Sequence, residues 1–137
     1  KISALIDSRC VQIQDITDRV IAALPGIQMA MRERIGQRLA EVREQLDQTR
    51  VETEMVVFAN RMDVSEELER LATHVLEVQR MLGENKPTGR RLDFLMQELN
   101  REANTLGSKS VDTQMTNASV DLKVLIEQMR EQIQNIE

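Results

Sequence analysis

The chain has 137 residues, 41% hydrophobic and 30% charged, and this composition excludes an intrinsically disordered protein. It contains two Phe, no Trp or Tyr, five Gly and two Pro, too few aromatic and turn residues for an all-β fold. A net charge of −5 argues against nucleic-acid binding through bulk positive charge. We therefore expect an all-α fold with a core of Leu, Ile, Val and Met.

A long helical hairpin is predicted at residues 1–60. Apolar residues recur every three or four positions through residues 2–24, and Pro25-Gly26 then interrupts the pattern. A second apolar series at residues 35–56 alternates steps of four and three between Arg and Glu residues, which is typical of a coiled-coil seam. Two helices joined by a tight Pro-Gly turn pack antiparallel, so we expect a scaffold, an arm or an oligomer contact.

Cys10 is the single cysteine, which excludes an internal disulfide and a cysteine metal cluster. It lies at helical spacing from Ile6 and Ile13, so we expect a small buried side chain without a chemical role. No apolar run approaches the ~18 residues that span a bilayer, and no leader precedes the first helix. These features predict a cytoplasmic protein without membrane contact. Because the chain starts at Lys1 in mid-helix register, we expect it to be a piece of a longer protein.

A small C-terminal domain of about three helices is predicted at residues 61–137. The side chain of Asp63 is expected to cap the first helix while Glu66 reaches back to the cap, and Gly83 is expected to end it. The predicted helices occupy residues 63–82, 90–106 and 116–137.

Four polar side chains lie on one border of the apolar stripe of the helix at 63–82: Asp63, Glu67, Arg70 and His74. An imidazole in such a strip can bind a metal or transfer a proton, and a carboxylate one or two turns away can assist it. In the alternative interpretation, Asp63 is a cap, Glu67 and Arg70 form a surface pair, and His74 is a solvated flank residue.

The next helix carries a column of mostly amide side chains: Asp93, Gln97, Asn100 and Asn104, with Arg90 and Arg101 at its border. Asn is a poor helix former, so the column indicates hydrogen bonding, for instance to an RNA backbone or to base edges. The alternative is a polar seam between helices that sets their register. Another strip lies on the other side of the apolar face and holds Arg91, Glu98 and Glu102.

On the last helix a charged strip comprises Lys123, Glu127, Arg130 and Gln134, for which the alternative is a set of solvated ion pairs. Three such strips on neighbouring helices can enclose one cleft. No Gly-rich phosphate loop, serine nucleophile elbow or zinc-protease motif is present in the sequence. The candidate catalytic groups that remain are carboxylates and one histidine, which are the residues used in metal-assisted hydrolysis of phosphodiester bonds.

Three stretches carry a family resemblance: residues 63–74 (DVSEELERLATH), 89–109 (GRRLDFLMQELNREANTLGSK) and 120–137 (VDLKVLIEQMREQIQNIE). From about residue 50 onward, the chain closely resembles the C-terminal half of bacterial YicC-like proteins. The resemblance implies an endoribonuclease that cleaves RNA, and not DNA, with a divalent metal, Mn²⁺ or Mg²⁺. It also implies a homo-oligomer, a hexamer, and an N-terminal domain of comparable size outside this chain.

The resemblance also implies roles for the residues of the polar strips. The expected catalytic residues are His74, Glu67 and Glu98. The expected metal ligands are Glu67, His74, Asp93, Glu98 and Glu102. The expected RNA-binding residues are Arg70, Arg90, Arg91, Gln97, Asn100, Arg101, Asn104, Lys109, Lys123 and Arg130. A competing hypothesis is a non-catalytic helical adaptor that binds RNA or a protein partner, and a third is a purely structural oligomerisation hairpin.

Overall fold

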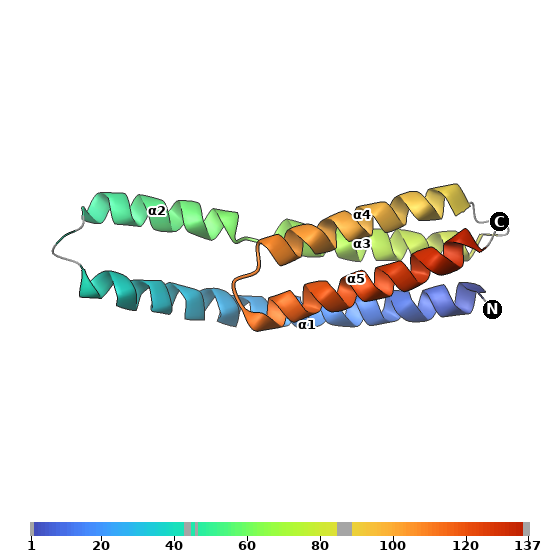
Figure 1. Ribbon diagram of the computed structural model, residues 1–137, viewed down its shortest axis with the longest axis horizontal. Helices are drawn as coiled ribbons and strands as arrows, with labels where there is room; N and C mark the ends of the chain where they lie inside the picture. Colours follow the sequence, from blue (N-terminus) through green and yellow to red (C-terminus); the bar gives the residue numbers. More distant parts are fainter. Residues whose placement is uncertain (1, 43–44, 46, 85–88, 136–137) are drawn as a thin grey trace.

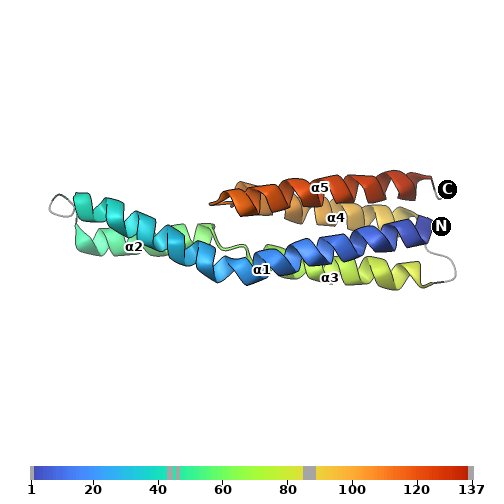
Figure 2. The same ribbon diagram turned by 90° about the horizontal axis from the view of Figure 1, so that it is seen from below.

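The computed structural model describes residues 2–42, 45, 47–84 and 89–135. Within these residues it contains five helices and no strand, which confirms the all-α prediction: α1 (Ile2–Glu41), α2 (Gln48–Arg61), α3 (Ser65–Leu82), α4 (Gly89–Ser108) and α5 (Thr113–Gln134). The first part of α1 lies beside α3, α4 and α5 in a four-helix bundle, and the rest of α1 projects with α2 as an arm (Figures 1 and 2). None of the described helices is both long and apolar enough to cross a membrane.

One hydrophobic core joins the four helices of the bundle. The helix α4 packs against α3 and α5, and α1 packs against the same two helices from the other side. The buried apolar residues of α1 extend from Ile6 to Leu24 and belong to the same core as those of α3, α4 and α5. Residues 6–24, which we expected in a separate hairpin domain at 1–60, therefore complete the core of the C-terminal helices.

The helix α1 does not end at Pro25-Gly26 but runs through Pro25 to Glu41, so the predicted turn at this position is wrong. A proline inside a helix removes one backbone hydrogen bond and crowds the preceding turn, which can bend a helix without ending it. Figure 2 shows that α1 changes direction where it leaves the bundle. The hairpin connection lies instead between α1 and α2, where the Asp47 carboxylate accepts a hydrogen bond from the Thr49 amide at 3.0 Å.

Short-range hydrogen bonds set the starts of α3 and α5. The N-cap of α3 is Val64, without a side-chain cap bond, so the prediction of Asp63 as the cap is wrong. Asp63 instead lies one residue earlier, and its Oδ1 accepts from the backbone N–H and the hydroxyl of Ser65 at 3.0 and 2.7 Å. Glu66 does not reach back to the start of the helix, because its carboxylate pairs with Arg70 at 3.3 Å. The helix α5 begins at Thr113 rather than near residue 116, because the Asp112 side chain caps its first turn.

The single thiol lies inside the core, as predicted. Cys10 has no exposed surface, and its Sγ lies 3.9 Å from the sulfur of Met129. Burial, with a further contribution from Asp7, raises the pKa of the Cys10 thiol to about 12. The thiolate fraction is therefore negligible near neutral pH.

Folded protein should accordingly resist alkylation of Cys10 by iodoacetamide at pH 8, because the thiolate is the reacting species. In concentrated urea the same thiol should react at the rate of an ordinary cysteine. Mass spectrometry of the intact protein over time would follow the modification. Equal rates with and without urea would contradict the buried position of Cys10.

Candidate functional site

A polar border of α3 meets a polar border of α4 along their shared edge. Two ion pairs between these antiparallel helices set the register: Arg70 Nε lies 3.0 Å from Glu102 Oε2, and Arg91 Nη2 lies 4.0 Å from Glu77 Oε1. We define the α3/α4 seam as the polar residues along this edge: Glu67, Arg70, His74 and Glu77 of α3, Arg91, Glu98 and Glu102 of α4, and Lys109 just after α4. Two of the strips recognised in the sequence thus face each other.

The register of the seam brings His74 of α3 to about the level of Glu98 of α4. His74 follows Arg70 by four residues and Glu98 precedes Glu102 by four, so the register that pairs Arg70 with Glu102 also places His74 opposite Glu98. Both side chains are half-buried, and neither forms an ion pair or hydrogen bond with another residue that the structure describes. An imidazole and a carboxylate on facing borders of one seam are groups that can transfer protons or bind a ligand between them.

Two carboxylates at the arm end of the seam are buried and paired with cations of the same chain. Glu67 is 1% and Glu102 5% exposed. Lys109 Nζ donates to Glu67 Oε1 at 2.5 Å and to the backbone carbonyl of Asp63 at 3.1 Å. Arg70 contacts Glu102 and also lies 3.8 Å from Glu67 Oε2, and the hydrogen bond with Glu102 raises the pKa of the Arg70 guanidinium. Glu67, which we expected to be a catalytic residue and metal ligand, is instead buried and paired with Lys109.

The five predicted metal ligands do not form one site. Glu67 and Glu102 are neutralised by Lys109 and Arg70. Asp93 points from the other side of α4 toward α5, where Arg130 Nε lies 3.7 Å from its Oδ1. In the part of the chain that the structure describes, no three His, Cys, Asp or Glu side chains are grouped so that they could hold a metal ion. His74 and Glu98 supply two donors, so a metal between them would need further ligands from water or from residues outside this part.

The predicted RNA-binding residues divide into two groups. Arg70, Arg91 and Lys109 belong to the seam and are engaged there in ion pairs. The remaining seven are exposed on two adjacent helices and form what we call the α4/α5 face: Arg90, Gln97, Asn100, Arg101 and Asn104 of α4, with Lys123 and Arg130 of α5. The contact of Asp93 with Arg130 sets the antiparallel register of this pair of helices and brings Asn100 level with Lys123.

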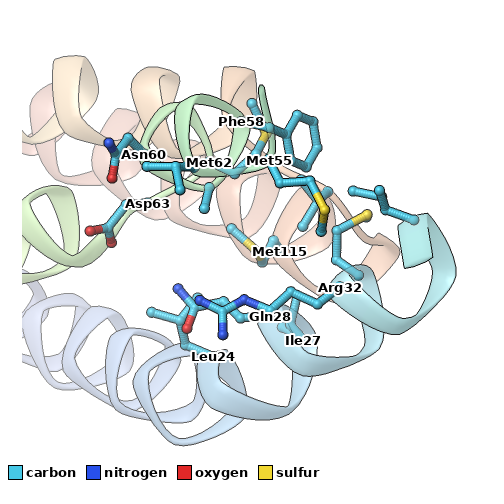
Figure 3. A pocket seen from close by; sticks show the side chains of 15 residues that line it. Leu24, Ile27, Gln28, Arg32, Met55, Phe58, Asn60, Met62, Asp63 and Met115 are labelled. Atoms are coloured by element: carbon cyan, nitrogen blue, oxygen red, sulfur yellow. The ribbon is translucent and has the colours of Figure 1, made fainter. Parts of the chain in front are cut away.

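A groove of about 330 Å³, which was not predicted from the sequence, lies between α1 and α2 where the arm joins the bundle. Its walls are mostly apolar and come from α1, α2 and the start of α5 (Figure 3): Leu24, Ile27, Met31, Met55, Phe58, Met62 and Met115. No residue of α2 is buried, because the groove separates it from α1. The signal available in the sequence was the number of methionines, which favour adaptable apolar surfaces.

Comparison with known proteins decides the family. Residues 20–137 match the family model described as "Endoribonuclease YicC-like, C-terminal". The chain belongs to the YicC-like endoribonuclease family. It is 50% identical over 137 residues to a "Probable endoribonuclease YicC" of Haemophilus influenzae and 33% identical over 140 residues to a protein of the same name in Clostridioides difficile. Each match includes the whole chain and 48% of the relative, so the chain spans about half the length of these proteins.

The YicC-like match includes both polar surfaces described above. Its range, residues 20–137, contains α2 to α5 entirely, and with them the α3/α4 seam and the α4/α5 face. The resemblance inferred from three stretches of sequence is thereby confirmed. Roles of single residues in this YicC-like chain depend on the geometry of those two surfaces.

Acid should weaken the hydrogen bonds between Asp63 and Ser65 at the start of α3. Hydrogen bonds from Ser65, together with the charge of Lys109, hold the pKa of the Asp63 carboxyl below its ordinary value. A carboxyl of this kind contributes stability above its unfolded pKa of ~3.9, and the contribution disappears as the pH falls through the folded pKa. We expect the free energy of unfolding to decline below pH ~4, and less steeply in Asp63→Asn. Urea denaturation at several pH values tests this, and parallel curves for the two proteins would contradict it.

Proposed function

We propose that this chain is the C-terminal part of an endoribonuclease and contributes His74 and Glu98 to the hydrolysis of RNA phosphodiester bonds. The observation that carries the proposal is the Arg70–Glu102 ion pair, because the register it sets brings His74 to about the level of Glu98 on α4, the helix that also carries the exposed Arg and amide side chains of the α4/α5 face. Membership of the YicC-like family supports it, as do the printed names of the two relatives.

In the proposed reaction, His74 transfers a proton and Glu98 orients the imidazole or binds a divalent metal, Mn²⁺ or Mg²⁺. Such a metal, when bound, polarises the phosphoryl oxygen and activates water. Arg90 and Arg101 bind phosphates, for which the planar guanidinium is well suited. Since the described residues of one chain provide two donors at this level, we propose that a homo-oligomer, a hexamer, supplies the remaining ligands from another subunit or from the other half of the protein.

The test of the activity is cleavage of a labelled RNA hairpin by the full-length protein and by this chain, each with Mn²⁺, with Mg²⁺ and with a chelator. We expect the full-length protein to cut in the presence of metal and to stop when the metal is chelated. Cutting by this chain alone would mean that the active site is complete within it. Cleavage that persists undiminished in chelator would contradict the metal requirement.

Substitution of the central pair tests the residues. His74→Ala and Glu98→Gln should each lower the cleavage rate of the full-length protein by about 100-fold or more, the usual contribution of a positioned proton-transfer group. Glu69→Gln is the matched control, because Glu69 is an exposed carboxylate of α3 outside the seam. Its rate should equal that of the wild type. A wild-type rate in His74→Ala with metal still bound would remove His74 from the site.

A non-catalytic adaptor is the second candidate function. It is favoured by one observation, the engagement of Glu67 and Glu102 in internal ion pairs rather than with an open metal site. An adaptor would bind RNA through the α4/α5 face and leave cutting to another nuclease. Purified full-length protein that binds the hairpin but leaves it intact with either metal would favour this function.

A further inference from the structure

Phe94 is the aromatic residue of the bundle, and its side chain lies outside the core. It is 59% exposed, whereas the neighbouring apolar residues of α4, such as Leu92 and Leu95, are buried. Single exposed apolar side chains are common in soluble proteins and do not by themselves mark a site. What distinguishes Phe94 is the set of residues around it.

Exposed cations flank Phe94 on the same ridge of α4. Arg90 precedes it by four residues and Arg101 follows it by seven, so both share its helical face, about 6 and 10 Å away along the axis. Neither arginine forms an ion pair with another residue in the described ranges. By contrast, the arginines of the seam, Arg70 and Arg91, are both paired.

We propose that Phe94 stacks on a base of single-stranded RNA while Arg90 and Arg101 bind phosphates on either side of it. The inference rests on the proposed function, which makes RNA the occupant of the face. Charge complementarity favours this occupant: an aromatic ring between exposed guanidinium groups matches the alternation of base and phosphate, and proteins that bind single strands combine such rings with cations.

The same placement makes Phe94 a positioning residue for the proposed reaction. Glu98 follows Phe94 by one helical turn, about 6 Å along α4, and borders the ridge on the side of the seam. A base held on the ring therefore brings the adjoining part of the RNA backbone to the level of His74 and Glu98. Stacking does not depend on base identity, so the face should accept any single-stranded sequence.

Binding of a fluorescent single-stranded oligouridine to the full-length protein tests the proposal by anisotropy, with Ca²⁺ present and the RNA checked on a gel for integrity. Phe94→Leu keeps an apolar side chain but removes the ring, and it should weaken binding by about 10-fold, within the usual range for one stacked base. Phe94→Trp should bind at least as tightly as the wild type. Leu76→Ala is the matched control, because Leu76 of α3 is also 59% exposed but lies off this ridge. Its affinity should not change.

Two further measurements identify the occupant. An abasic oligomer should bind the wild type and Phe94→Leu equally, because it offers no base to stack. Equal affinity of wild type and Phe94→Leu for oligouridine would overturn the inference. So would a change in oligomeric state confined to Phe94→Leu, which would assign the ridge to a protein contact. If the wild type cuts RNA and Phe94→Leu binds oligouridine as tightly as the wild type, the stacking inference is refuted but the proposed function stands. If the wild type neither binds nor cuts RNA, both are refuted.

Discussion

Lys109→Met should lower the free energy of unfolding by about 3 kcal/mol, the usual cost of removing one partner from a buried ion pair. Lys109 Nζ is the hydrogen-bond donor to Glu67 Oε1, and Glu67 is 1% exposed. Without the ammonium group a buried carboxylate lacks its hydrogen-bonding partner, and Arg70 Nη2 at 3.8 Å from Glu67 Oε2 is too far away to replace it. Urea denaturation followed by circular dichroism at pH 7 measures the loss.

Two further variants show whether burial is the cause. Adding Glu67→Gln to Lys109→Met should restore part of the stability, because a neutral amide is less costly to bury than an unpaired charge. Arg80→Met removes an exposed cation that pairs with Glu77 and Glu84, and it should leave the urea midpoint close to that of the wild type. Equal losses in Lys109→Met and Arg80→Met would show that Glu67 does not depend on Lys109.

The double variant also separates stability from RNA binding. Lys109 was predicted to hold phosphate, and the structure instead engages it with Glu67 and with the carbonyl of Asp63. If its role is internal, the Lys109→Met, Glu67→Gln protein should bind RNA as the wild type does once it is folded. A loss of affinity in the folded double variant would return Lys109 to the RNA-binding set.

The helical class followed from composition and apolar spacing, but the course of α1 did not. Pro25 and Gly26 are strong local signals for a turn, and the prediction used them as such. In the structure the helix on one side of Pro25 is held in the bundle core up to Leu24, and the other side continues into the arm. Local propensity is a weak guide where the flanking turns are supported by tertiary contacts.

Helical spacing grouped the candidate side chains of each helix on a common strip, but it could not show which strip of a neighbouring helix would face it. His74 shares a strip with Arg70, and Glu98 shares one with Glu102, as helical geometry requires. That these strips meet depends on the register of α3 against α4, which arises from packing. The burial of Glu67 was equally inaccessible, because its partner Lys109 lies 42 positions away along the chain.

Gly107→Ala should reduce the free energy of unfolding by about 1–3 kcal/mol, because another side chain already fills the space that the added methyl group would occupy. A Cβ at this position would lie 2.5 Å from Ser119 Oγ and 3.3 Å from Ser119 Cβ, where α4 crosses α5. The hydroxyl cannot simply rotate away, since it donates a buried hydrogen bond of 2.8 Å to the Ala103 carbonyl. Gly107 has no positive φ, so close approach of the helices, and not backbone conformation, requires glycine here.

At two other positions, replacing glycine with alanine should raise the free energy of unfolding instead of lowering it. Gly26 and Gly36 lie inside α1 with no atom within 4 Å of an added Cβ, so Ala there should stabilise the protein by about 0.5–1 kcal/mol through helix propensity. Combining Gly107→Ala with Ser119→Ala should recover part of the loss, because the clashing oxygen is removed. The urea midpoints of the four variants test these expectations. A higher midpoint for Gly107→Ala than for the wild type would mean that α4 and α5 are farther apart than the contact with Ser119 requires.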